Sequence, residues 1–237
     1  MQSILRSFST FGTGCCRTAA LSGCLFLLTA LSTNGTIILG TSFVGDNDET
    51  GGVFNIKNIS AQSIELTGFQ LHLRGSGDIR FWTYDGPFQE TVENQATWGN
   101  PQVEPDYWTL RQEFENVQGG GIGSPTGLLN LTSSVTILPG ETMGMAFYLV
   151  NPGTNDRFRR TSESGVTVDD VRVSDENLEI YWAHRVTQNF ENRSGYSATT
   201  RGFDIVVHAV PENASIAVIA GLAGLLWVLR RRRAGTR

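Results

Sequence analysis

Lysine and cysteine are scarce in this sequence of 237 residues. It contains one lysine, Lys57, and three cysteines, all of which lie within the first 24 residues. With 18 basic against 23 acidic side chains, the net charge is −5, and the chain lacks the basic excess typical of nucleic-acid binding. The 27 glycines argue against a helical bundle, and a hydrophobic content of 40% is too high for a disordered chain. The sequence therefore predicts a folded protein that has no nucleic acid among its partners.

Residues 1–32 have the features of a secretory signal peptide. Arg6 and Arg17 supply positive charge, an apolar run extends from Ala19 to Leu31, and the segment contains no acidic residue. The run has the length of a signal-peptide core and is too short to remain as a membrane span. We therefore expect recognition by Sec-type export machinery and cleavage within several residues of Ser32.

Leu21-Ser22-Gly23-Cys24 offers an alternative N-terminus. It matches a bacterial lipobox, which would make Cys24 a lipidated first residue. A lipobox ends the apolar segment, whereas here Leu25–Leu28 continues it, and this favours cleavage near Ser32. Such cleavage leaves no cysteine in the mature chain, so that disulfides, thiolate catalysis and cysteine metal sites are excluded.

The C-terminus combines an apolar segment with a cluster of arginines. Residues 214–229 are 16 uncharged residues, and Arg230, Arg231, Arg232 and Arg233 follow at once. A helix of this length spans about 24 Å, slightly less than a hydrocarbon core of about 30 Å. Because arginines mark the cytoplasmic end of a span, the segment predicts a transmembrane helix with the body of the protein outside. The alternative is a buried C-terminal helix, which the adjacent arginines disfavour.

Immediately before this segment stands the motif Val210-Pro211-Glu212, within residues 210–215. The motif, the short apolar helix and the arginine cluster together resemble the PEP-CTERM sorting signal of Gram-negative bacteria, although Asn213 stands where that family has a second proline. The resemblance covers about residues 210–234. It implies that an exosortase, a processing enzyme of the membrane, recognises residues 211–237 as a sorting tail. It also implies delivery to the cell surface or extracellular matrix, with the arginines as a stop-transfer signal and the proline keeping the motif extended and accessible.

The segment between the two ends, residues 33–210, carries a net charge of −11, against +2 for residues 1–32 and +4 for residues 211–237. Its 178 residues suffice for one domain with a substantial core. Short apolar alternations separated by Gly, Pro, Asn and Asp predict strands throughout. The expected strands cover residues 53–59, 64–73, 79–84, 107–114, 128–138, 142–150, 166–173, 178–186 and 197–210. The sequence thus predicts an all-β fold, a single β-sandwich or jelly roll.

Local features refine this prediction. The apolar phase changes at Gly68, which indicates a β-bulge, and Pro139-Gly140 indicates a turn. The body is also similar, in the order of GGVFNIKN, SIELTGFQLHL, DIRFWTYDGPF and ILPGETMGMAFYL, to a β-sandwich module of secreted bacterial surface proteins. That similarity implies a fold and a location, and no chemistry.

Few residues suggest a metal or catalytic site. Asp46, Asp48 and Glu49 begin like an EF-hand loop, but Lys57 occupies the position that requires a bidentate carboxylate. A solvated loop is therefore favoured, with a calcium site of another type as the alternative, and no other cofactor is expected. His184 lies in phase with Leu178, Ile180, Trp182 and Val186, which predicts a hydrogen-bonded core histidine. Glu113 and Glu115 share a strand face like a glycosidase pair, but nothing else supports catalysis.

The strongest candidate for binding is aromatic. Seven aromatic residues lie within residues 81–108, and if Ile79 and Phe81 point inward, Arg80, Trp82 and Tyr84 share the opposite face. Flat rings bind the apolar faces of sugars, and Arg80 can hold hydroxyls or a carboxylate. The competing interpretation, that the rings cover the core, is favoured.

We therefore expect an exported structural or adhesive protein, without enzymatic activity, of the cell surface or extracellular matrix. It is held in the inner membrane by its C-terminal helix during transit. A surface-displayed carbohydrate-binding module that uses the aromatic face to bind extracellular polysaccharide is one alternative. A secreted glycan-acting enzyme is the other.

Overall fold

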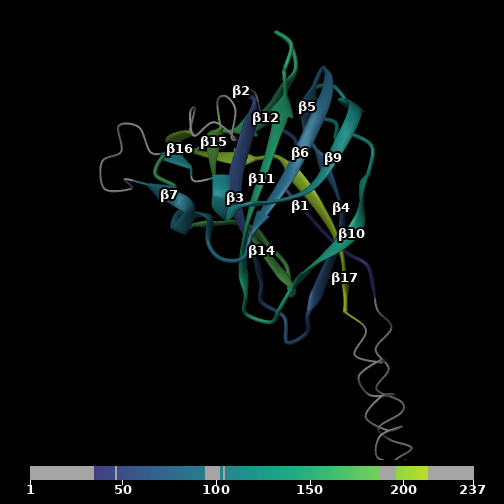
Figure 1. The fold of residues 1–237 in the computed structure, drawn as a ribbon, viewed down its shortest axis with the longest axis vertical. Helices are drawn as coiled ribbons and strands as arrows, with labels where there is room; N and C mark the ends of the chain where they lie inside the picture. Colours follow the sequence, from purple (N-terminus) through teal and green to yellow (C-terminus); the bar gives the residue numbers. More distant parts are fainter. Residues whose placement is uncertain (1–34, 46, 94–101, 104, 187–195, 213–237) are drawn as a thin grey trace, which may run out of the picture. The chain divides into compact units, whose positions relative to one another are not determined.

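The computed structural model describes residues 35–45, 47–93, 102–103, 105–186 and 196–212, which belong to one compact unit, Gly35–Glu212 (Figure 1). These residues form strands, turns and two short 3₁₀ helices, which confirms the predicted all-β fold. Within these ranges no helix is long and apolar enough to cross a membrane. The predicted signal peptide (1–32), transmembrane helix (214–229) and arginine cluster (230–233) lie outside the described residues.

The smaller of the two main sheets has four antiparallel strands in the order β1-β17-β4-β10. Their bounds are Ile37–Gly40 for β1, Ile205–Pro211 for β17, Ile64–Leu71 for β4 and Leu129–Ile137 for β10. The first and last strands of the body therefore pair with each other.

The larger sheet follows the order β2-β12-β16-β15-β3-β11-β6-β9. These strands are β2 (Asn47–Glu49), β12 (Arg157–Thr161), β16 (Tyr196–Phe203), β15 (Ala183–Val186), β3 (Gly51–Asn58), β11 (Thr142–Val150), β6 (Ser76–Tyr84) and β9 (Thr109–Gln118). Attached to it are β5 (Leu73–Arg74), β13 (Val171–Ser174) and β14 (Leu178–Tyr181). The remaining elements are a hairpin of β7 (Val92–Glu93) and β8 (Gln102–Val103), and the 3₁₀ helices η1 (Phe88–Thr91) and η2 (Pro105–Tyr107).

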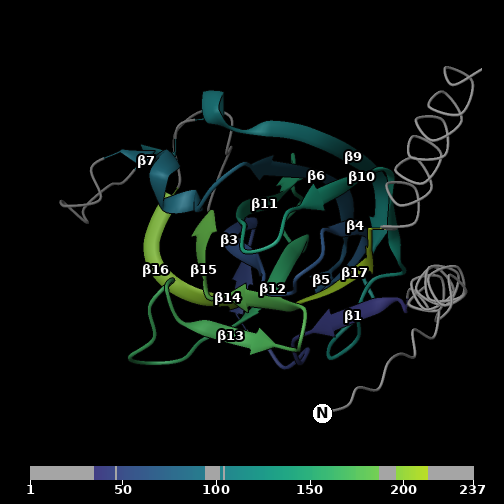
Figure 2. The same cartoon turned by 90° about the horizontal axis from the view of Figure 1, so that it is seen from below.

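Both sheets contribute to one hydrophobic core, and their strands curve around a common centre (Figure 2). Phe69 of the small sheet meets Phe81 and Phe147 of the large sheet, with ring centroids 4.8 and 5.0 Å apart. Met143, Met145, Phe147 and Leu149, which alternate along the expected strand 142–150, are all buried in this core.

Two local predictions are also confirmed. The register of β4 shifts beside Gly68, which pairs with His208 while Leu66 pairs with Ala209, so one strand bulges as expected. The Pro139-Gly140 turn is closed by a hydrogen bond of 3.0 Å from the Glu141 N–H to the Leu138 carbonyl, and Gly140 has a φ of +77°. This is the positive φ that glycine supplies in a type II turn.

The predicted strands 64–73 and 197–210 are each broken by one buried polar residue. His72 separates β4 from β5, and Asp204 separates β16 from β17. At both breaks the chain passes from one main sheet to the other, and the two corners are joined by a 3.1 Å hydrogen bond from the His72 N–H to the Asp204 carbonyl. Sheet-switching corners of this kind interrupt a strand without interrupting its apolar pattern.

Two further predictions were wrong in part. The strand expected at 178–186 is broken at Trp182, whose N–H donates to the Asp170 carbonyl at 3.1 Å. The break shifts the phase, so His184 is buried but lies on the face opposite to Leu178 and Ile180. The first half of the strand expected at 166–173 is a turn, in which the Asp170 carboxylate accepts from the Thr167 N–H at 2.6 Å.

Candidate functional site

The outer face of the large sheet, turned away from the main core, carries the predicted ligand face. Along β3, β11 and β6, alternate residues such as Phe54, Phe147 and Phe81 are fully buried in the core. The residues between them therefore point outward, because successive side chains of a strand point to opposite sides. The three strands are neighbours in the centre of the sheet (Figure 1).

Arg80, Trp82 and Tyr84 share this outer face, as the sequence predicted from Ile79 and Phe81. All three are half-buried, whereas Ile79 and Phe81 are fully buried. The placement of the residues is thereby confirmed, and their role in binding stays a prediction.

Hydrogen bonds hold the polar ends of this face in place. Arg80 donates from Nε to Glu113 Oε2 at 2.7 Å and from Nη1 to the Tyr148 hydroxyl at 3.1 Å. The Tyr84 hydroxyl donates to Glu90 Oε2 at 2.9 Å, and this hydrogen bond is the main cause of a raised pKa for Tyr84. A ligand on this face therefore meets a guanidinium whose charge Glu113 already balances.

The rings of Trp82 and Tyr84 also pack against a second, smaller apolar cluster, which combines Val53, Phe88, Trp108, Ala146, Tyr148 and Val168. Trp108 is buried within it and donates from Nε1 to the Thr91 hydroxyl at 3.0 Å. This favours the interpretation that part of the aromatic segment covers apolar surface. Trp82 and Tyr84 are half-buried, Tyr107 is 59% exposed, and Trp98 lies outside the described residues.

A polar cavity of about 180 Å³, which sequence reasoning missed, lies on the same outer face. It is lined by Asn55, Lys57, Pro87, Gln89, Thr142, Asp169 and Tyr181. The signal in the sequence was weak: Asn55 and Lys57 are two polar residues at alternate positions of a strand whose neighbours are apolar. Their partners come from η1 and from residues more than 80 positions away, and no local pattern indicates them.

The acidic segment considered for calcium is engaged in ion pairs. Asp48 pairs with Arg74 at 3.0 Å and Arg159 at 3.1 Å, while Glu49 pairs with Arg160 and, at 3.2 Å, with Arg185. Because Asp48 is exposed and Glu49 is buried on the short strand β2, their carboxylates point to opposite sides. The structure does not bring these two together, and Asp46 lies outside the described residues. Within the described ranges, no group of three or more metal-ligating side chains is found.

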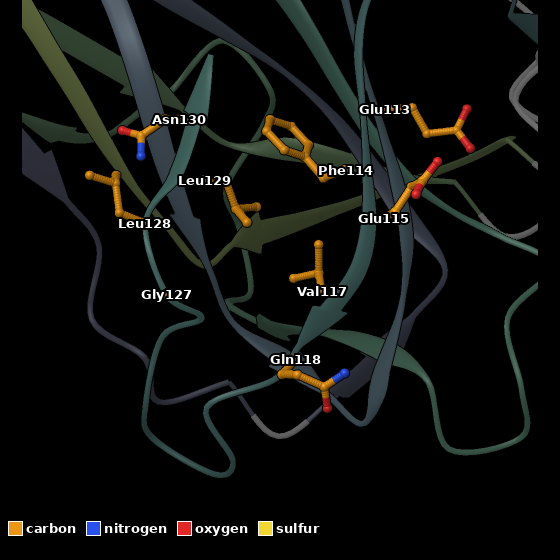
Figure 3. A pocket seen from close by; sticks show the side chains of 9 residues that line it. All are labelled: Glu113, Phe114, Glu115, Val117, Gln118, Gly127, Leu128, Leu129 and Asn130. Atoms are coloured by element: carbon orange, nitrogen blue, oxygen red, sulfur yellow. The ribbon is translucent and has the colours of Figure 1, made fainter. Parts of the chain in front are cut away.

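Glu113 and Glu115 border a groove of about 600 Å³ between the edge strands β9 and β10. Figure 3 shows Phe114, Val117 and Leu129 pointing into the groove, whereas both carboxylates point away from it. The groove therefore opens toward the main core, and the two glutamates share one face of the strand, as predicted, which is the face turned away from the groove. Glu113 is paired with Arg80.

The predicted sorting motif is partly built into the small sheet. Val210 and Pro211 end β17, paired with Glu65 and Ile64, and the Glu212 N–H donates to the Ser63 carbonyl at 2.7 Å. The motif is extended, as expected. It is less accessible than expected, since Val210 and Pro211 are half-buried and only Glu212 is exposed.

Two comparisons with known proteins gave no match. No model of a known protein family matches the chain, and no curated protein does so.

Proposed function

We propose that the chain is an exported protein of the cell surface or extracellular matrix, with a structural or adhesive β-sandwich body. The observation that carries this proposal is where the body ends. The compact all-β unit runs from Gly35 to Glu212, between the predicted signal peptide and the predicted transmembrane tail. Its last strand stops at the Pro-Glu pair, so removal of the tail after this point would release an intact body.

The same proposal assigns the membrane helix and Arg230–Arg233 to a stop-transfer role, and the removal of the tail to an exosortase. The net charge of −11 on residues 33–210 suits a soluble domain outside the cell.

Cell fractionation combined with intact mass measurement tests this proposal. The native chain should reach the surface or the matrix with a mass that lacks the C-terminal tail. The double variant Pro211→Ala, Glu212→Ala should remain in the membrane with the tail attached. Glu176→Ala, a change at an exposed acidic residue, is the control and should be processed normally. A native chain that stays in the cytoplasm, or surface material that still carries the tail, would contradict the proposal.

The half-exposed rings beside Arg80 favour a second candidate function, the binding of extracellular polysaccharide. Trp82→Ala should abolish retention on a polysaccharide affinity gel, because it removes the flat surface on which a sugar ring would pack. Trp82 also packs on the second apolar cluster, so Trp82→Phe serves as a variant that keeps most of this contact. Leu138→Ala, at a 55% exposed apolar residue of the Pro139-Gly140 turn, is the control. Unchanged retention of a folded Trp82→Ala protein would rule this candidate out.

A further inference from the structure

Lys57, the only lysine of the chain, is one of the residues that line the polar cavity on the outer face. On β3 it lies between Thr142 of β11 and Glu179 of β14, which are its neighbours across the two adjacent strands. Lys57 is half-buried.

The charge of Lys57 is unused by the described residues. None of them forms an ion pair within 4 Å or a hydrogen bond with it, although Glu179 is directly opposite. The Glu179 carboxylate instead accepts from the Tyr181 hydroxyl at 2.7 Å. With Glu179, its neighbour across the strand, engaged by Tyr181, Lys57 is available to a ligand.

The wall of the cavity facing Lys57 is a chain of hydrogen-bonded side chains. Asn55 accepts from the Phe88 N–H at 2.8 Å and donates from Nδ2 to Gln89 Oε1 at 2.8 Å. Gln89 in turn donates from Nε2 to Asp169 Oδ1 at 2.9 Å. Each side-chain amide has two N–H donors, and a single bond from each leaves one donor of Asn55 and one of Gln89 available. The wall is thus held rigid while keeping groups for a ligand.

The composition of the lining limits the class of ligand. Donors (Lys57 and the amides) stand beside acceptors (Asp169 and the Thr142 hydroxyl), and Pro87, the Tyr181 ring and the carbon stems of the polar side chains supply apolar surface. Vicinal hydroxyl groups, which both donate and accept, match such a mixture. Binding of an anion is disfavoured because Asp169 and Glu179 stand close to Lys57 in a segment whose net charge is −11.

We propose that the Lys57 cavity binds one uncharged sugar residue of a glycan. At about 180 Å³ it is smaller than the 300–1,000 Å³ of pockets that enclose drug-sized ligands, and so it suits one ring. The site is distinct from Arg80, Trp82 and Tyr84. The proposal depends on the proposed surface location only for the source of the glycan. Binding of a sugar to the cavity is measured on the purified protein.

The single lysine makes the test selective. An amine-reactive ester labels Lys57 and the chain N-terminus alone, and peptide mass separates the two. Glucose, galactose and mannose, each added in the millimolar range to the purified full-length protein, are the uncharged probes, and glucuronic acid is the charged one. At least one uncharged hexose should slow acylation of Lys57 fivefold or more, while glucuronic acid leaves the rate unchanged.

Calorimetric titration of variants with the protecting hexose completes the test. Lys57→Gln should weaken binding at least tenfold, whereas Arg74→Gln, with the same loss of charge at an exposed residue of β5 outside both candidate sites, should leave it unchanged. The proposal is overturned if no uncharged hexose protects Lys57, if only glucuronic acid does, or if Arg74→Gln weakens binding as much as Lys57→Gln. Because the Trp82→Ala affinity test concerns the aromatic face and fractionation concerns export, either can fail independently of this result.

Discussion

Several segments that are distant in the sequence form hydrogen bonds with the carboxylate of Asp204. It is buried, and it accepts hydrogen bonds from the Gly45 N–H, the Thr161 hydroxyl, the Arg172 guanidinium and His72 Nδ1. The Gly123 N–H donates to His72 Nε2 at 3.2 Å, and this assigns the proton of the neutral ring to Nδ1, which donates to Asp204. The Asp204 side chain therefore links both sheet-switching corners to the loop between β1 and β2, to β12 and to β13.

Asp204→Ala should be strongly destabilising. Burial lowers the pKa of Arg172, and the hydrogen bond and charge of Asp204 act against this effect. Removal of the carboxylate leaves a mostly buried cation unpaired, and breaking such a pair costs about 3–5 kcal/mol. Urea unfolding measures the loss in free energy. Glu176→Ala, at an exposed carboxylate, should change it by less than about 0.5 kcal/mol, and an equal effect of the two variants would contradict this account.

Tyr181 gives a prediction for alkaline pH. Burial, then its hydrogen bond to Glu179, raises the pKa of Tyr181 to about 12. The unfolded phenol ionises at about 10, so between pH 10 and 12 the folded state holds more protons than the unfolded state. The contribution of Tyr181 to stability is therefore complete below pH 10 and is lost as the pH rises to 12. Tyr181→Phe should flatten this part of the pH dependence of the melting temperature, and an unchanged slope would disprove the assignment.

The sequence predicted inward and outward residues well where a strand follows simple alternation, as in residues 79–84. It failed at β12, Arg157–Thr161, because its inward positions are Phe158 and the charged Arg160. Burial of Arg160 depends on Glu49, which is more than 100 residues away, and no local pattern reveals such a partner. The Lys57 cavity was missed for the same reason.

At the scale of elements, the short helix η1 determines the shape of the outer face. Phe88, its first residue, is fully buried on Gly144 of β11, where an added Cβ would lie 3.1 Å from the Phe88 Cβ. The Gly144 N–H also donates to the Gly86 carbonyl at 2.7 Å, and Asn55 accepts from the Phe88 N–H. The packing of η1 on β11 places the aromatic residues of β6 on one side of η1. On the other side, Gln89 lines the Lys57 cavity.

Phe88→Ala should therefore affect both stability and the Lys57 cavity. Loss of a fully buried phenylalanine costs about 3–5 kcal/mol, and the loosened η1 withdraws Gln89 from the wall. We expect a lower urea midpoint together with faster acylation of Lys57, while Phe88→Leu should give a smaller change in both. A Phe88→Ala protein with the native midpoint and acylation rate would show that η1 does not depend on this contact.

The strands themselves were largely predictable, and their ends were not. Alternation located the centres of β3, β4, β6, β10, β11 and β14, together with the bulge at Gly68. The corners at His72 and Asp204 escaped prediction because a chain that changes sheets keeps its apolar spacing while its partners change. Which strand pairs with which depends on long-range packing, and a single sequence does not contain that information in local form.

At the scale of the whole molecule, the charge distribution and the sheet order point to the same junction. The charge changes from −11 over residues 33–210 to +4 over residues 211–237, close to the point where β17 ends. Pro211 is the last residue of that strand, and a proline at this position removes one donor from the ladder. We expect the end of β17 to open more readily than its centre, where Val207 and Ala209 are buried in the core.

Locking this end should slow removal of the tail. Glu65 and Val210 are direct antiparallel partners, and the separation of such pairs is close to what a disulfide needs. If the chain is exported as proposed, it meets an oxidising environment, in which Glu65→Cys with Val210→Cys should crosslink β4 to β17 and keep Pro211 and Glu212 in the sheet. We expect pulse-chase and intact mass to show the crosslinked chain retaining its tail, with normal processing restored by a reductant. The pair Val171→Cys with Tyr181→Cys, partners between β13 and β14, is the control and should be processed at the native rate. If the crosslinked chain loses its tail as fast as the native one, processing precedes the pairing of β17, and the folded motif is not the substrate.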